Sequence, residues 1–171
     1  MGVLDIARRG AAAETPVSTP VRLASTTLAA GSSAPLPGVW NPVRGLVWGA
    51  GTDAATQALR AAGMSSTSLT TSAKTILLTD ASFAWNSPAD VQLTFGEKGL
   101  QRIEAVFKQP PALEVAIAGY ERQFGKPHTK TIVSQEQVST IAWRVKQTWA
   151  TLEITLTETQ GTLRAIFEVS R

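Results

Sequence analysis

Apolar and polar residues alternate along several stretches of this chain, and a period of two is typical of β-strands with one buried face. The clearest alternation runs through residues 90–95 and returns through 101–107, which predicts a hairpin. A second hairpin is predicted from residues 148–157 and 162–169. Shorter apolar runs predict further strands at 45–49, 74–79, 82–85, 130–133 and 141–145.

Two other segments place apolar residues at the spacing of a helix. The first follows Thr52 and Asp53, whose side chains are suited to cap a helix, and it ends before Gly63. The second follows Pro110 and Pro111, which a first helical turn tolerates. Its apolar residues are Leu113, Ile117, Tyr120 and Phe124, and Gly125 follows them.

The two halves of the chain show these signals in the same order. Gly63 and Gly125, which each end a predicted helix, are as far apart in sequence as Gly99 and Gly161, which lie in the two hairpin turns. The tripeptide Lys-Thr-Ile also follows each predicted helix. Self-similarity in a fixed order is typical of repeats. We therefore predict an α+β fold of two repeated helix plus antiparallel-meander units, with the helices packed on one face of the sheet.

A low-complexity arm is expected to precede this domain. Residues 1–38 form the arm, and from residue 11 onward they are mostly Ala, Ser, Thr, Pro and Gly. Such a segment is interpreted either as a flexible linker or as an extended arm that becomes ordered on a partner. Residues 39–171 form a single predicted domain, with one repeat at 39–110 and the other at 111–171.

Composition excludes several classes of protein. The 171 residues carry a formal net charge of only +3, which is too small for the concentrated positive field typical of a nucleic-acid-binding protein. No apolar stretch approaches the roughly 20 residues that span a membrane. The absence of cysteine excludes disulfides, thiol catalysis and cysteine-based metal sites.

The first residues do not predict a signal peptide. Asp5 comes early, and Arg8 and Arg9 stand where a signal peptide requires an apolar run. Two possibilities remain open for the location of the protein. It is extracytoplasmic if a leader was removed before Met1, and otherwise it is cytoplasmic or associated with a particle.

Residues for catalysis are scarce. His128 is the single histidine, and it lies in a polar loop after the second predicted helix. The glutamates mostly occupy polar strand faces or turns, and the chain contains neither a nucleophile elbow nor a glycine-rich phosphate loop. We therefore expect no catalytic residues, no metal site and no cofactor, and a protein that is not an enzyme.

The five tryptophans are more informative. Strand parity places Trp85 and Trp143 among core residues, whereas Trp149 falls on the polar face of its strand. Tryptophan and arginine are the residues that most often anchor protein interfaces. The predicted protein-binding face therefore consists of Trp149, Arg144, Arg164, Ile166 and Arg102. There are two alternatives for Trp149. A loop or the arm covers its side chain, or its ring stacks on a nucleic acid.

Several of these features occur together in known small domains. They are Trp48, Gly49, Leu59, Gly63, the 91–107 hairpin, Tyr120, the 124–127 segment and the 149–169 hairpin. In this plan the chain resembles small bacterial envelope domains, namely the outer-membrane assembly lipoproteins (SmpA/OmlA-like) and the tandem-repeat β-lactamase inhibitor proteins. The resemblance implies an α+β fold and a binding role. The chain departs from the first group in lacking a lipobox cysteine, and from the second in lacking disulfides.

The sequence thus predicts a non-catalytic protein-binding or assembly module that uses an outer sheet face and its N-terminal arm. Its partner is another protein or a second copy of the chain, and the resemblance implies an association with the cell envelope. The alternative is a structural subunit of a large particle, such as a virion or a secretion-type assembly. A hydrolase of unknown substrate is the third reading.

Overall fold

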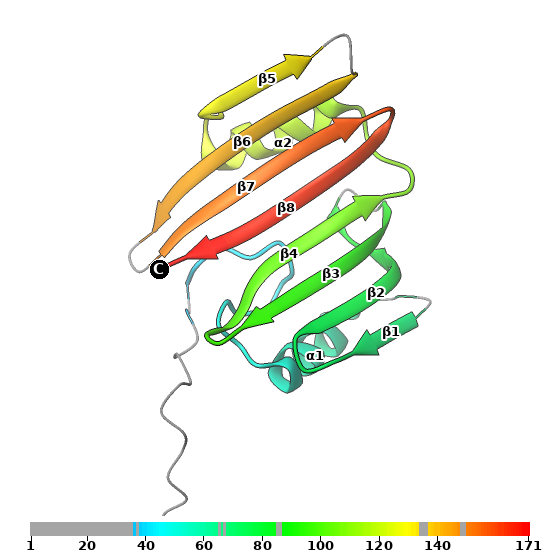
Figure 1. Cartoon of the computed structure of the whole chain (residues 1–171), viewed down its shortest axis with the longest axis vertical. Coiled ribbons are helices and arrows are strands. Elements are labelled where there is room, and N and C mark those ends of the chain that lie inside the picture. Colours follow the sequence, from blue (N-terminus) through cyan, green and yellow to red (C-terminus); the bar gives the residue numbers. More distant parts are fainter. Residues whose placement is uncertain are drawn as a thin grey trace, which may run out of the picture.

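A computed structural model describes residues 36, 38–64, 66, 68–84, 87–133, 137–147 and 150–171. This part of the chain forms one eight-stranded antiparallel sheet and two helices (Figure 1). The elements are α1 (Thr52–Ala61), β1 (Ser68–Thr71), β2 (Thr75–Ser82), β3 (Pro88–Gly96), β4 (Gly99–Phe107), α2 (Leu113–Phe124), β5 (Thr129–Val133), β6 (Val138–Gln147), β7 (Ala150–Thr159) and β8 (Thr162–Ser170).

The strand order is β1-β2-β3-β4-β8-β7-β6-β5, so the strands of both halves belong to a single sheet. The seam lies between β4 and β8, which pair from Arg102 opposite Glu168 to Phe107 opposite Leu163. Both strands alternate apolar and polar residues, so their apolar rows merge across the seam.

This continuous sheet corrects the predicted fold class. Of the described residues, 52% lie in strands and only 18% in helices, so the fold is mostly β. The prediction of an α+β protein built from two repeated helix units was therefore wrong. The two helical patterns in the sequence suggested two separate units, each with a helix on its own sheet. Both helices are present, but each is short. The sheet supplies most of the buried apolar surface instead.

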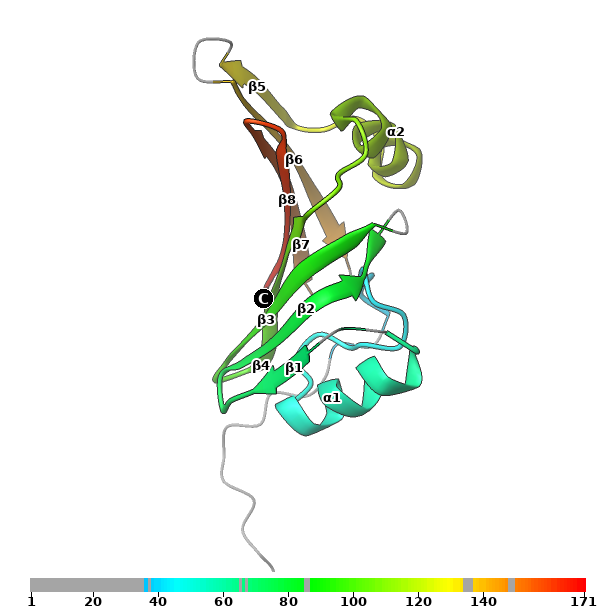
Figure 2. The same cartoon turned by 90° about the vertical axis from the view of Figure 1, so that its right-hand side faces the viewer.

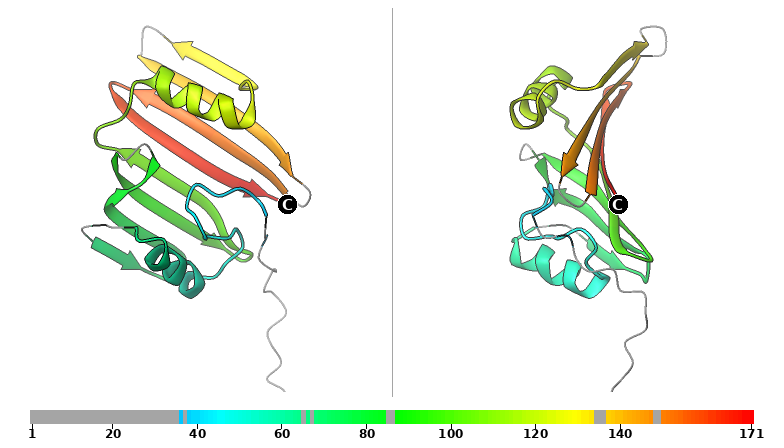
Figure 3. Two further views of the ribbon diagram at one scale, coloured as in Figure 1. Left: turned by 180° about the vertical axis from the view of Figure 1, so that it is seen from behind. Right: turned by 90° about the vertical axis from the view of Figure 1, so that its left-hand side faces the viewer.

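Both helices lie on the same side of the sheet (Figures 2 and 3). The segment 38–51 runs between them and covers the ends of the central strands (Figure 3). Its buried residues are Val39, Val43, Leu46, Trp48 and Ala50. The predicted strand at 45–49 is absent, because Trp48 alone pairs there, in an isolated bridge with Leu36. Leu36 is buried although it belongs to the predicted arm, and residues 1–35 lie outside the described part of the chain.

An aromatic cluster fills the centre of this layer. The Phe167 ring of β8 packs against Trp40, Phe83 and Tyr120, with ring centroids 5.9–6.2 Å apart. Trp143 is 1% exposed and contacts Tyr120 at 5.5 Å. These rings join α2 and the 38–51 segment to the sheet, and they account for much of the buried apolar area. Trp85, predicted to share this core, lies outside the described residues.

Several local predictions also changed. Helix α1 is preceded by Gly51, and no side chain caps it, so neither Thr52 nor Asp53 has the predicted capping role. Strand β2 is continuous where two short strands were expected, and a bulge between Leu78 and Ala81 interrupts its register with β3. Strand β1 was not predicted, because its Ser-Leu-Thr-Thr sequence carries no clear alternation.

Candidate protein-interaction face

The face of the sheet opposite the helices is uncovered by any described segment. We call it the open face, and it consists of the side chains that alternate with the buried ones along each strand. The sheet is twisted, and this face looks away from both helices (Figure 2). Antiparallel sheets commonly carry one such polar face. The residues at its centre are Gln92, Arg102, Glu104, Val106, Glu153, Thr155, Arg164, Ile166 and Glu168.

Glu104 is the centre of an ion-pair network on this face. Its carboxylate lies 2.9 Å from the guanidinium of Arg102 and 3.3 Å from that of Arg164. Arg102 also lies 3.7 Å from Glu168 on the neighbouring strand. Only 22% of the Glu104 side chain is exposed, because the two arginines cover it. The network thereby connects two positions of β4 with two positions of β8, a strand that is far away in sequence.

A hollow of about 250 Å³ lies beside this network. Its walls include the exposed Leu77 on β2 and the half-buried Val106 on β4, while Glu104 borders it on the side of the network. Ile166 lies directly opposite Glu104 on β8 and extends the apolar surface beyond the carboxylate. The other residues of the hollow are Leu78, Thr79, Asp90, Val91 and Gln92.

The edge of the hollow is held by a lysine between two aspartates. Lys108 forms ion pairs with Asp80 and with Asp90, the latter at 3.2 Å. Asp80 lies in the bulge of β2 and has a φ of 51°, a backbone conformation that few residues other than glycine adopt. The hydrogen bond that Lys108 donates to Asp80, followed by the interaction with Asp90, raises the pKa of Lys108 above its ordinary value. The lysine thus bridges β2 and β3 beside the bulge.

The strand registers place four of the five predicted binding residues on the open face. Arg102 and Arg164 share Glu104, Arg144 on β6 lies 2.8 Å from Glu153, and Ile166 lies between Glu104 and Thr155. The arginines are therefore paired within the chain, which the sequence did not predict. Trp149 lies outside the described residues.

Leu77 and Glu104 were missed by the sequence prediction. Leu77 stands between the buried Ile76 and Leu78, so a run of three apolar residues hid its outward direction. Strand parity alone would have identified it, because the neighbours on both sides point inward. Glu104 was interpreted as one solvated carboxylate among many. Its partner Arg102 is two residues away on the same strand, but Arg164 comes from β8, and only the strand register brings it to Glu104.

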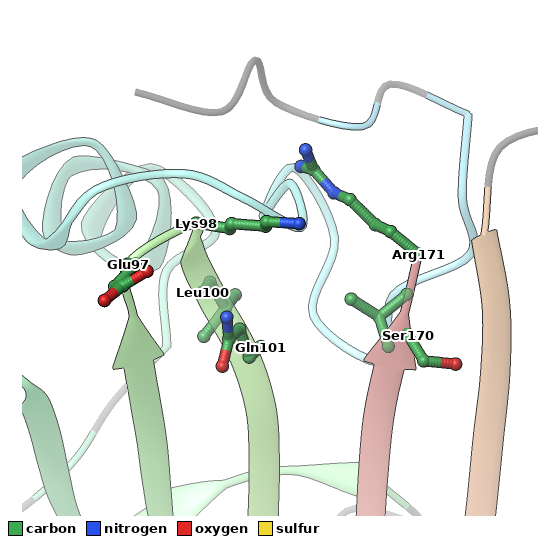
Figure 4. A pocket seen from close by; sticks show the side chains of 7 residues that line it. Glu97, Lys98, Leu100, Gln101, Ser170 and Arg171 are labelled. Atoms are coloured by element: carbon green, nitrogen blue, oxygen red, sulfur yellow. The ribbon is translucent and has the colours of Figure 1, made fainter. Parts of the chain in front are cut away.

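A second hollow, of about 400 Å³, lies at the ends of β4 and β8. Lys98 and Arg171 extend over it from opposite sides, whereas Glu97 points away (Figure 4). No histidine is among its described lining residues. His128 is exposed in the loop before β5, far along the chain from this hollow. The hollow thus offers two cations and no acid–base pair.

The described residues contain no group of three or more His, Asp or Glu side chains placed to hold a metal ion. Within the same residues, no helix has the length and apolar character needed to cross a membrane. No protein-family model, curated protein or solved structure matches this chain. The open face is therefore interpreted from its own geometry.

Proposed function

We propose that this protein is a non-catalytic binding module that recognises a protein partner through the open face of its sheet. The observation that carries the proposal is the open face itself, where a hollow bordered by Leu77 and Val106 lies beside an ion-pair network. Protein interfaces typically combine an apolar centre with a polar rim. Here Leu77 and Val106 supply apolar surface on one side of the arginine–glutamate pairs, and Ile166 supplies it on the other side.

The internal ion pairs make this face suited to rigid recognition. Arg102 and Arg164 are held on Glu104 before any partner arrives, so less side-chain freedom is lost on binding. The same pairing neutralises most of the charge, which favours a partner surface without a strong net charge. Leu77 is 43% exposed, and burying it on a partner contributes favourable free energy.

The test compares variants on the two sides of the sheet. Ile166→Glu and Leu77→Glu place a charge in the apolar surface of the open face. Val115→Glu is the control, because Val115 is an exposed aliphatic residue on α2, away from the open face. A partner is first isolated with the immobilised wild-type chain, and its affinity for each variant is then measured by calorimetry.

We expect the two open-face variants to lose about 2 kcal/mol or more of binding free energy, the scale of an interface hot spot. The Val115→Glu variant should bind as the wild type does. Circular dichroism should show that all three variants are folded. If the partner binds all variants equally, the open face is not its site and the proposal fails.

The second candidate is a structural subunit of a large particle. The observation that favours it is the pair of outer strands, β1 and β5, each of which pairs on one side alone within the described residues. Free strand edges are templates for joining subunits. Sedimentation of the full chain would show species that grow with concentration if this candidate is correct.

A further inference from the structure

Among the described residues, β5 is the outer strand of the sheet next to β6, and its other edge is unpaired. All five of its residues, Thr129 to Val133, are exposed. Ile132 is 60% exposed and Val133 is 39% exposed, so two aliphatic side chains lie at the rim of the sheet. An exposed strand edge presents a row of unpaired backbone N–H and C=O groups to any strand that approaches it.

The devices that usually protect such an edge are almost absent from β5. The strand contains no proline and a single charged residue, Lys130. Its pairing with β6 continues over all five residues from Thr129 opposite Ala142 to Val133 opposite Val138. Natural edge strands are commonly protected by charges, proline or bulges. Strand β5 therefore has the regular backbone that strand addition requires.

The opposite edge of the sheet is less open. Strand β1 lies next to α1, whereas β5 extends beyond α2 toward the tip of the molecule (Figure 2). The single exposed aliphatic residue of β1, Leu69, is 38% exposed. A second chain thus approaches β5 with less steric hindrance than β1.

We propose that β5 pairs in antiparallel orientation with β5 of a second copy of this chain, about a two-fold axis at Thr131. In this register Thr131 faces Thr131 of the second copy, Lys130 faces Ile132, and Thr129 faces Val133. No like charges lie directly opposite each other. Each Lys130 stem packs along the aliphatic Ile132 of the other copy, and both exposed aliphatic residues lose exposure.

The self-complementary sequence is the reason for choosing a second copy as the occupant. A two-fold interface uses the same patch on both subunits, so each residue must suit its partner in both directions. The strand Thr-Lys-Thr-Ile-Val meets this condition, with threonine at its centre and no carboxylate that needs a cation. The resulting dimer would carry one sheet twice as wide, with both open faces on the same side.

The first experiment is a cysteine cross-link, for which this cysteine-free chain is well suited. Opposed residues of antiparallel strands have Cα atoms about 4.5–5.5 Å apart, which is within the range for a disulfide. Thr131→Cys should therefore give a disulfide-linked dimer under mild oxidation. Thr70→Cys is the matched control, because Thr70 is an exposed threonine in the middle of β1. We expect Thr131→Cys to cross-link at least roughly tenfold faster than the control.

The second experiment tests the register by charge, using the full chain in sedimentation equilibrium. Ile132→Lys places a lysine opposite Lys130 of the other copy, and the dimer should dissociate at concentrations where the wild type is dimeric. Ile132→Glu places a carboxylate opposite the same lysine, and the dimer should persist. Both variants should fold, because Ile132 is mostly exposed in the single chain.

Three results would overturn the proposal. They are a wild type that is monomeric at every concentration, equal behaviour of the two Ile132 variants, and cross-linking of Thr131→Cys no faster than that of Thr70→Cys. Species larger than a dimer would also overturn it and would favour the particle subunit. None of these results bears on the open face, whose partner binding is measured separately with the Ile166 and Leu77 variants.

Discussion

The indole nitrogen of Trp143 donates a hydrogen bond to the carbonyl oxygen of Gly125 over 2.9 Å. Gly125 follows the last residue of α2, so this bond attaches the end of the helix to β6. The bond satisfies one of the carbonyl groups that a helix leaves free at its C-terminus. It also orients the indole ring against Tyr120, and the second helix is thereby fixed to the sheet.

Two substitutions of Trp143 should therefore lower the free energy of unfolding by different amounts. Trp143→Ala removes the buried ring and should cost about 3–5 kcal/mol of unfolding free energy. Trp143→Phe keeps much of the packing and loses the hydrogen bond, and it should cost about 1–2 kcal/mol. Urea denaturation followed by circular dichroism measures both. Equal losses for the two variants would show that the ring contributes little beyond its hydrogen bond.

Gly99 and Gly161 provide a matched pair in the two hairpin turns. Both have positive φ, 78° and 79°, so alanine is strained at either position. A methyl group at Gly99 would overlap the backbone of Gly49, whereas the space around Gly161 is open. Gly161→Ala should cost about 1–2 kcal/mol from backbone strain alone. Gly99→Ala should cost clearly more, because Gly49 and Leu100 are joined by a backbone hydrogen bond of 2.9 Å and do not separate freely.

Both variants are measured in the same denaturation experiment. The difference between their losses of unfolding free energy reports how tightly the 38–51 segment packs against β4. If the two substitutions are equally costly, the segment moves to make room, and its packing on the sheet is looser than the contacts indicate.

The stability of the protein should fall in alkaline solution because of Tyr120. Burial raises the pKa of this phenol above its ordinary value of 10.0 in the folded protein. The unfolded chain ionises near the ordinary value, so the contribution of the neutral phenol is complete below pH 10.0 and is lost as the pH rises above it. Tyr120→Phe removes this titration and should make the denaturation midpoint less dependent on pH in that range.

Tyr120 is the single tyrosine of the chain, so the ultraviolet absorbance of tyrosinate reports on it alone. In the folded protein this absorbance should appear only at a pH well above 10.0, and in urea it should appear near that value. An ordinary titration in the folded protein would show that the ring is open to solvent.

Leu36 is the first described residue of the chain, and it belongs to the core. It is 9% exposed, and its backbone nitrogen donates to the carbonyl oxygen of Trp48 over 2.8 Å. Leu36→Ala should cost about 2 kcal/mol or more. Deletion of residues 1–35, which contain few large apolar side chains, should leave the midpoint of thermal unfolding nearly unchanged. A large loss on this deletion would show that the segment contributes to the fold.

The sequence by itself was sufficient for most of the elements. The alternation in residues 90–107 and 148–169 predicted both central hairpins, and apolar residues at helical spacing predicted α1 and α2. These signals are local, because strand and helix periods are set by the chain geometry of consecutive residues. The same parity also separated the buried Leu152 and Ile154 from outward-facing residues such as Thr155.

Only the tertiary structure decided how these elements combine. Whether β4 pairs with β8 depends on residues about sixty positions apart, and no local pattern encodes that contact. The merger of the strands into one sheet changed the fold class to mostly β, and it placed Arg164 of β8 beside Glu104 of β4. Sequence parity assigns a residue to a face of its own strand, but the strand register assigns its neighbours. The open face and its ion pairs follow from that register.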